Sequence, residues 1–172
     1  MTIIRDETRS DEPGLDELIA EAFRGHPRSH GEEPRIVRGL RDCGALAVSL
    51  VAEDAGRIVG HVALSPVQIA GAICHWFGLG PLSVHPDQQG RGIGSALVQE
   101  GIRRLRERSA RGCVVLGYPA YYPRFGFQVE PGLTLAGSTP GHFMALCLDP
   151  PPPEGRVGYH PAFYPGASRD DA

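Results

Sequence analysis

The chain has 172 residues, of which 41% are hydrophobic and 22% charged, and it carries a formal net charge of −3. This size and composition predict a single globular domain over residues 1–172, and the slightly acidic balance argues against a nucleic-acid partner. No apolar run approaches the roughly 20 residues of a membrane-spanning helix, and the first residues lack a signal sequence. We therefore expect a cytoplasmic protein with no membrane partner.

The N-terminal quarter of the chain reads as a short strand followed by two helices. The strand covers residues 3–4, and Ser10 or Asp11 then caps the first helix. The apolar positions of this helix follow helical spacing: Leu15, Leu18, Ile19, Ala22 and Phe23. A polar loop over residues 25–34 leads to a second short helix over residues 35–42.

Three strands separated by tight turns follow the second helix. Residues 46–53 and 57–69 form a hairpin around the turn at residues 54–56. A second turn, over residues 69–73, leads into a strand that ends at Val84. Because short turns join antiparallel neighbours, these strands are expected to form one side of a sheet.

A glycine-dense turn follows Val84 and opens directly into a helical pattern. It covers residues 89–94 and reads Q-x-x-G-x-G. At such a turn the free N–H groups of the first helical turn bind phosphate, and glycines let the backbone come close to it. The turn does not match a dinucleotide-binding fingerprint, because Ser95 or Leu97 stands where the motif requires its last glycine. It does not match a Walker loop either, because the chain contains no lysine. The alternative is a turn that only connects a strand to a helix.

The helix after this turn has an apolar face and a basic face. The apolar face carries Leu97, Val98, Ile102 and Leu105, and the basic face carries Arg103, Arg104, Arg106 and Arg108. The arginines fit either a solvated helix face or a nucleic-acid surface, and the acidic balance of the chain favours the first. The apolar strand at residues 113–117 completes a crossover, which predicts parallel pairing and hence a mixed sheet.

The last part of the chain is rich in proline. Residues 144–148 form the last clear strand, and residues 149–172 form a proline-rich C-terminal tail. Within the tail we expect residues 157–164 to dock as a strand or coil and residues 168–172 to be disordered. The cysteines show no C-x-x-C spacing and the histidines no metal-binding spacing, so free thiols and no metal are expected.

Two motifs resemble those of the GNAT superfamily of N-acetyltransferases. The first is Q-x-x-G-x-G at residues 89–94, and the second is Y-x-x-x-G-F at residues 122–127. The stretch P-A-Y-Y-P-R-F-G-F, which contains the second motif, is similar to the corresponding stretch of the YhbS-like group of predicted bacterial acetyltransferases. The resemblance implies an α/β (α+β) fold with a twisted mixed β-sheet, flanked by helices, whose fourth and fifth strands splay apart.

The resemblance also implies roles for individual residues. The end of the fourth strand and the glycine turn are expected to bind acetyl-CoA, through Leu82, Ser83, Val84, Gln89, Gly90, Arg91, Gly92, Ile93, Gly94 and Ser95. Tyr122 is the expected catalytic acid, because a phenol with a pKa of about 10 can protonate a departing thiolate whose thiol has a pKa of about 8.5. The alternative for Tyr122 is a tyrosine that only packs against the cofactor.

The general base is not identified by the resemblance. Many members of the superfamily carry a glutamate or histidine on the fourth strand, at positions where this chain has Gly78 and Gly80. Other ionisable residues remain as substitutes, acting directly or through water: His75, Glu32, Glu33 and His142. Each of them also fits an ordinary surface or hydrogen-bonded residue.

These roles predict an N-acetyltransferase that transfers an acetyl group from acetyl-CoA to a primary amine of a small molecule or peptide. Residues 25–42 and 118–121 are expected to determine the choice of acceptor. The missing strand carboxylate leaves an alternative, a non-catalytic acyl-CoA-binding or regulatory module of the same fold. A monomer and a homodimer are both compatible with the sequence.

Overall fold

The computed structural model describes residues 1–164, so the predicted disorder at residues 168–172 lies outside the described residues. An eight-stranded sheet runs in the order β1-β2-β3-β4-β5-β7, and β8 pairs with both β3 and β6 beside this path. The strands are β1 (Thr2–Asp6), β2 (Val48–Asp54), β3 (Arg57–Ile69), β4 (Ala72–Val84), β5 (Gly112–Leu116), β6 (Leu133–Thr134), β7 (Phe143–Cys147) and β8 (Gly155–Gly158). The helices are α1 (Glu12–Phe23), α2 (Glu33–Asp42) and α3 (Ile93–Glu107), with short 3₁₀ helices η1 (Arg9–Asp11), η2 (Pro86–Gln88), η3 (Tyr122–Phe125) and η4 (Pro161–Phe163).

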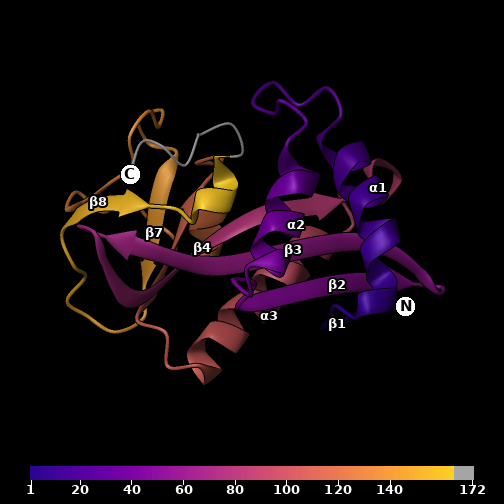
Figure 1. Cartoon of the computed structure of the whole chain (residues 1–172), viewed down its shortest axis with the longest axis horizontal. Helices are drawn as coiled ribbons and strands as arrows, with labels where there is room; N and C mark the ends of the chain where they lie inside the picture. Colours follow the sequence, from indigo (N-terminus) through magenta and orange to yellow (C-terminus); the bar gives the residue numbers. More distant parts are fainter. Residues whose placement is uncertain (165–172) are drawn as a thin grey trace.

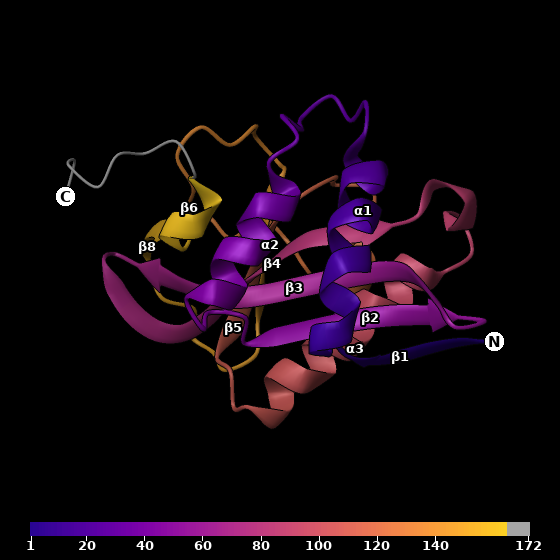
Figure 2. The ribbon, with the colours of Figure 1, turned by 45° about the vertical axis from the view of Figure 1, so that its right-hand side comes forward.

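Helices cover both faces of the sheet (Figures 1 and 2). Helices α1 and α2 pack on one face, where Ala63 of β3 joins a cluster with Leu15 and Val37. Helix α3 packs on the other face, and a Cβ added at Gly60 of β3 would lie 2.9 Å from Leu97 of α3. The alternation of side chains along β3 therefore separates two apolar layers, as the period of a strand requires.

Strands β4 and β5 pair over only part of their length. Their parallel register covers Trp76↔Gly112, Phe77↔Cys113 and Gly78↔Val114. Beyond Gly78, β4 continues to Val84 paired with β3 alone, while β5 pairs with β7 on its other side. The structure therefore confirms the mixed sheet and its splayed fourth and fifth strands.

The boundaries of several segments differ from the sequence expectation by one or two residues. Helix α2 begins at Glu33, two residues before the predicted start, because Pro34 occupies its first turn. Proline is tolerated there, since its missing N–H has no intrahelical partner in any case. Residues 157–164 were expected to dock as a strand or coil, and Val157 of β8 pairs with Ile69 of β3 and is buried.

Candidate functional site

A cavity of about 590 Å³, called the cleft below, lies where β4 and β5 part. Leu79, Gly80, Pro81, Leu82 and Val84 of β4 line one side, and the residues that follow β5 line the opposite side. The end of α1, the start of α2 and the C-terminal segment complete its wall. The cleft therefore depends on the incomplete pairing of two central strands.

The glycine turn lies at one end of the cleft. Gly90 and Gly92 have φ angles of +75° and +83°, which glycine adopts without a steric penalty. The side chain of Gln89 closes the turn by donating from Nε2 to the carbonyl oxygen of Val84 at 3.2 Å. The first backbone hydrogen bond of α3 runs from the N–H of Ala96 to the carbonyl oxygen of Gly92 at 3.0 Å. The N–H groups before Ala96 therefore have no partner inside the helix. This geometry suits an anion such as a phosphate.

The predicted cofactor-binding residues fall into two neighbouring groups, one along the cleft and one in the glycine turn. Leu82, Val84 and Gln89 line the cleft, whereas the side chain of Ser83 is buried on the other face of β4 and can offer only its backbone. The remaining residues form the turn and the first turn of α3: Gly90, Arg91, Gly92, Ile93, Gly94 and Ser95. The Ser95 hydroxyl lies 3.2 Å from the hydroxyl of Tyr121, which connects α3 to η3.

Tyr122 begins η3 and borders the cleft with only 8% of its surface exposed. Its ring lies against Gly117, where an added Cβ would overlap it, and makes an edge contact with Phe127 at a centroid distance of 5.8 Å. Burial, with smaller contributions from Tyr121 and Cys113, raises the pKa of the Tyr122 phenol. The phenol is therefore protonated at neutral pH and can act as a proton donor.

The four candidate bases lie in different places. Glu33 lines the cleft, and its Oε2 accepts a hydrogen bond from the Ser29 hydroxyl at 2.8 Å. His142 packs near Tyr118 with ring centroids 6.4 Å apart but does not line the cleft. Glu32 also lies outside the lining, and His75 lies in the first part of β4, at the end opposite Val84. Glu33 is thus the candidate that the fold brings to the cleft.

Sequence reasoning missed Tyr159, which follows β8 and lines the cleft. A Cβ added at Gly78 would lie 2.5 Å from Cε1 of Tyr159. The tyrosine ring therefore fills the space of a side chain on the fourth strand, and burial raises the pKa of its phenol. Only the dense aromatic composition of residues 159–164 could have suggested this contribution.

His26, in the loop after α1, belongs to the range 25–42 that is expected to determine the choice of acceptor, and it lines the cleft. Its Nδ1 accepts from the backbone N–H of Arg28 at 3.2 Å, and its Nε2 lies 3.3 Å from the hydroxyl of Tyr118. The same loop reaches Thr139, whose hydroxyl accepts from Arg28 at 3.4 Å. The loop after α1 and the segment before β7 therefore meet across the mouth of the cleft.

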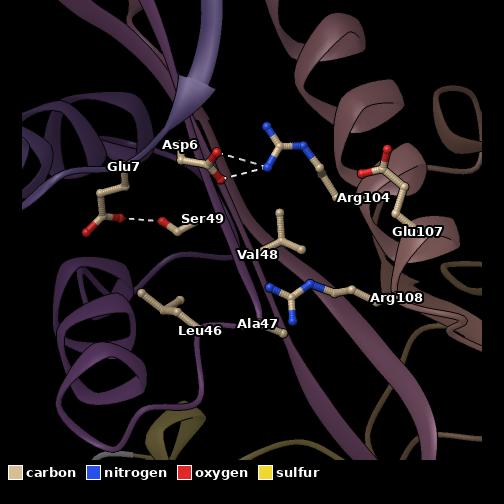
Figure 3. A pocket seen from close by; sticks show the side chains of 9 residues that line it. All are labelled: Asp6, Glu7, Leu46, Ala47, Val48, Ser49, Arg104, Glu107 and Arg108. Carbon is tan, nitrogen blue, oxygen red and sulfur yellow. Dashed lines mark hydrogen bonds and ion pairs between the residues drawn. The ribbon is translucent and has the colours of Figure 1, made fainter.

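A second cavity of about 470 Å³ lies between β2 and the end of α3 (Figure 3). Its charged groups compensate one another, since Asp6 pairs with Arg104 at 2.8 Å and Glu7 pairs with Arg41 at 2.7 Å. Ser49 donates to Glu7 and also lies 2.9 Å from Nε2 of the fully buried His61. A nucleophilic triad would need an acidic partner on Nδ1 of His61, and this atom has no partner within residues 1–164.

Two of the four arginines on the basic face of α3 are paired with carboxylates. Arg103 pairs with Glu100 and Glu107, and Arg104 pairs with Glu100 and Asp6. These pairs support a solvated helix face over a nucleic-acid surface. Among residues 1–164, no helix is long and apolar enough to cross a membrane, and no cluster of three potential metal ligands is present.

Comparison with known proteins identifies the family. The family model for the acetyltransferase (GNAT) domain matches residues 3–129. The chain is 38% identical over 140 residues to the uncharacterized N-acetyltransferase YhbS of Escherichia coli K12, covering 81% of both chains.

Two solved structures resemble the whole fold. A GNAT family acetyltransferase from Brucella melitensis, in complex with acetyl-CoA, superposes with a TM-score of 0.86 and 44% identity over 95% of this chain and 98% of the other. Escherichia coli YhbS, in complex with CoA, superposes with a TM-score of 0.86 and 35% identity over 95% of this chain and 92% of the other. The protein described here therefore belongs to the GNAT family of acetyltransferases.

Proposed function

We propose that this protein transfers the acetyl group of acetyl-CoA to a primary amine. The observation that carries the proposal is that the glycine turn, the splayed end of β4 and Tyr122 border one cleft. The complexes of similar proteins with acetyl-CoA and CoA support the choice of co-substrate. The N–H groups at the start of α3 receive the pyrophosphate, and the backbone of Leu82, Ser83 and Val84 receives the pantetheine arm.

The reaction joins the amine nitrogen to the acetyl carbon and breaks the bond from that carbon to sulfur. The attacking amine must be neutral, so its proton goes to water in the cleft. The departing thiolate gains a proton from Tyr122, whose phenol is protonated because burial raises its pKa. Burial also disfavours the charged thiolate and so raises the pKa of the departing thiol. The difference in pKa between phenol and thiol is therefore smaller than the raised pKa of the phenol alone suggests. The nitrogen gives its second proton to solvent as the amide forms, and solvent returns a proton to the Tyr122 phenolate.

A pair of glycine substitutions tests the cofactor site. Gly92 and Gly71 both have positive φ, at +83° and +77°, and a Cβ at either would meet no atom within 4 Å. Ala substitution therefore strains both backbones similarly, but only Gly92 belongs to the proposed phosphate-binding turn. Losing one charge-assisted hydrogen bond costs roughly 1.5–3 kcal/mol, so Gly92→Ala is expected to weaken acetyl-CoA binding at least tenfold.

Isothermal titration calorimetry with acetyl-CoA measures this effect. Gly71→Ala, in the turn between β3 and β4, should bind acetyl-CoA as the wild type does. Equal affinities in the wild type and both variants would contradict the site.

A further inference from the structure

The acceptor side of the cleft has an aromatic wall that is anchored at two places. Tyr159 and Phe163 line it, with ring centroids 5.0 Å apart. Strand β8, which precedes them, pairs with β3, and a Cβ added at Gly39 of α2 would lie 3.1 Å from Ala162. Phe23 at the end of α1 also lines the cleft. A ligand there contacts aromatic rings that the fold holds in place.

The charge of this wall is set by few groups. Within residues 1–164, Glu33 is the only carboxylate that lines the cleft. The Ser29 hydroxyl donates to it at 2.8 Å and so restrains its position. Arg28 also lines the cleft, but its guanidinium donates to Thr139 at 3.4 Å and its backbone N–H to His26. The arginine therefore joins two loops, while the carboxylate remains available to a cation.

The position of Gly78 on β4, beside the acceptor side of the cleft, contributes no charge. Gly78 has no side chain, and the ring of Tyr159 occupies the space beside it. Burial keeps this phenol protonated, so it presents an aromatic surface and a neutral hydroxyl instead of an anion. The centre of the acceptor side is consequently apolar, and its negative charge is at Glu33.

We infer that the acceptor is a small primary amine on an apolar body, an inference that rests on the proposed acetyl transfer. Glu33 receives the ammonium group when the acceptor enters, and Tyr159 and Phe163 pack against its apolar body. Aromatic faces attract cations as well as apolar groups, so the wall and the carboxylate favour the same class of ligand. A cleft of about 590 Å³ that also holds the pantetheine arm leaves room for a small molecule.

Calorimetry with three matched ligands tests this inference on the full chain, alone and saturated with CoA. The probe is 2-phenylethylamine; 2-phenylethanol lacks its charge, and ethanolamine lacks its ring. We expect the probe to bind at least tenfold more tightly than either analogue. Glu33→Gln should weaken binding of the probe at least tenfold without changing binding of 2-phenylethanol. Glu32→Gln, at the neighbouring residue outside the cleft lining, is the control and should leave both affinities unchanged.

Several results would overturn the inference. One is equal or tighter binding of ethanolamine or 2-phenylethanol, and another is unchanged binding of the probe to Glu33→Gln. Tighter binding of 3-phenylpropanoate, which has the ring and a carboxylate but no ammonium group, than of the probe would show that the cleft selects an anion through Arg28 and would contradict the assignment to Glu33.

Thiol release separates this inference from the proposed function. Release with spermidine or glycylglycine but not with 2-phenylethylamine would overturn the acceptor class and leave acetyl transfer intact. The expected binding pattern without thiol release from any amine would overturn acetyl transfer and leave the ligand class intact.

Discussion

Burial gives Tyr122 both its protonation state and its fixed orientation. The ring packs on Gly117 and Phe127, and these contacts do not involve the hydroxyl. Tyr122→Phe should therefore fold normally and bind acetyl-CoA with unchanged affinity. A positioned general acid contributes roughly 10²–10⁴ in rate, so kcat should fall about 100-fold or more. Steady-state thiol release and calorimetry measure the two effects.

Tyr121→Phe is the matched control for this substitution. It removes the hydroxyl that lies 3.2 Å from Ser95, on a ring 5.1 Å from that of Tyr122. A loss of less than about fivefold in Tyr122→Phe, with chemistry limiting the rate, would assign Tyr122 to packing and leave water as the donor.

The pH profile adds a second test of Tyr122. An unperturbed phenol has a pKa of about 10 and would begin to lose its proton as the pH approaches that value. Because burial raises the pKa of Tyr122, its phenol stays protonated up to about pH 10. Between pH 8 and 10, kcat should therefore not decline through ionisation of this group. A decline in the wild type that is absent from Tyr122→Phe would contradict the proposed state.

At the scale of elements, one buried ion pair attaches α2 to the end of β1. Arg41 of α2, 17% exposed, donates to Glu7 at 2.7 Å. Burial alone would raise the pKa of Glu7, but hydrogen bonds from His61, Arg41 and Ser49 outweigh it and lower this pKa to about 2. Ionised Glu7 therefore stabilises the fold above its unfolded pKa of about 4.5, and this contribution is lost as the pH falls towards 2.

Substituting the two arginines of α2 separately tests this attachment. Arg41→Met leaves Glu7 without its cationic partner and should lower the free energy of unfolding by about 3 kcal/mol at pH 7. Arg38→Met breaks an exposed pair with Asp16, in which Arg38 is 54% exposed, and should cost less than about 1 kcal/mol.

Urea denaturation at several pH values measures both effects. The loss in free energy of unfolding caused by Arg41→Met should shrink as the pH falls from 4.5 to 2. Over this range Glu7 becomes protonated in the wild type too, so the ion pair no longer stabilises it. Equal deficits in the two variants at pH 7 would contradict the attachment.

The elements whose pattern is local were predictable from the sequence. The alternation and turns around residues 46–84 predicted three antiparallel strands, and the glycine turn predicted the start of α3. The start of β5 was predicted at residue 113, one residue late. The strand begins at Gly112, and the reason for a glycine at that position lies in a residue distant in the sequence. A Cβ at Gly112 would overlap the ring of Trp76, which no local pattern reveals.

For the whole molecule, the cofactor side of the cleft was predicted residue by residue, whereas the acceptor side was predicted only as the ranges 25–42 and 118–121. The motifs that resemble the family indicated the cofactor side, because they are continuous stretches of sequence. The acceptor side is built from the end of α1, the start of α2 and residues 159–164, which meet only after folding. Pairing of Gln68 and Ile69 with residues 157–158 places Tyr159 beside Gly78, and such long-range contacts leave no periodic signal.

Acetyl transfer to an amine is the claim on which the other proposals depend. The most direct measurement combines thiol release from acetyl-CoA with mass spectrometry of the amine, across a panel that includes 2-phenylethylamine. We expect one thiol per N-acetylated amine, and a rate about 100-fold lower in Tyr122→Phe. Tight binding of acetyl-CoA, with thiol release from every amine no faster than without protein, would contradict the account and identify a non-catalytic acyl-CoA-binding module.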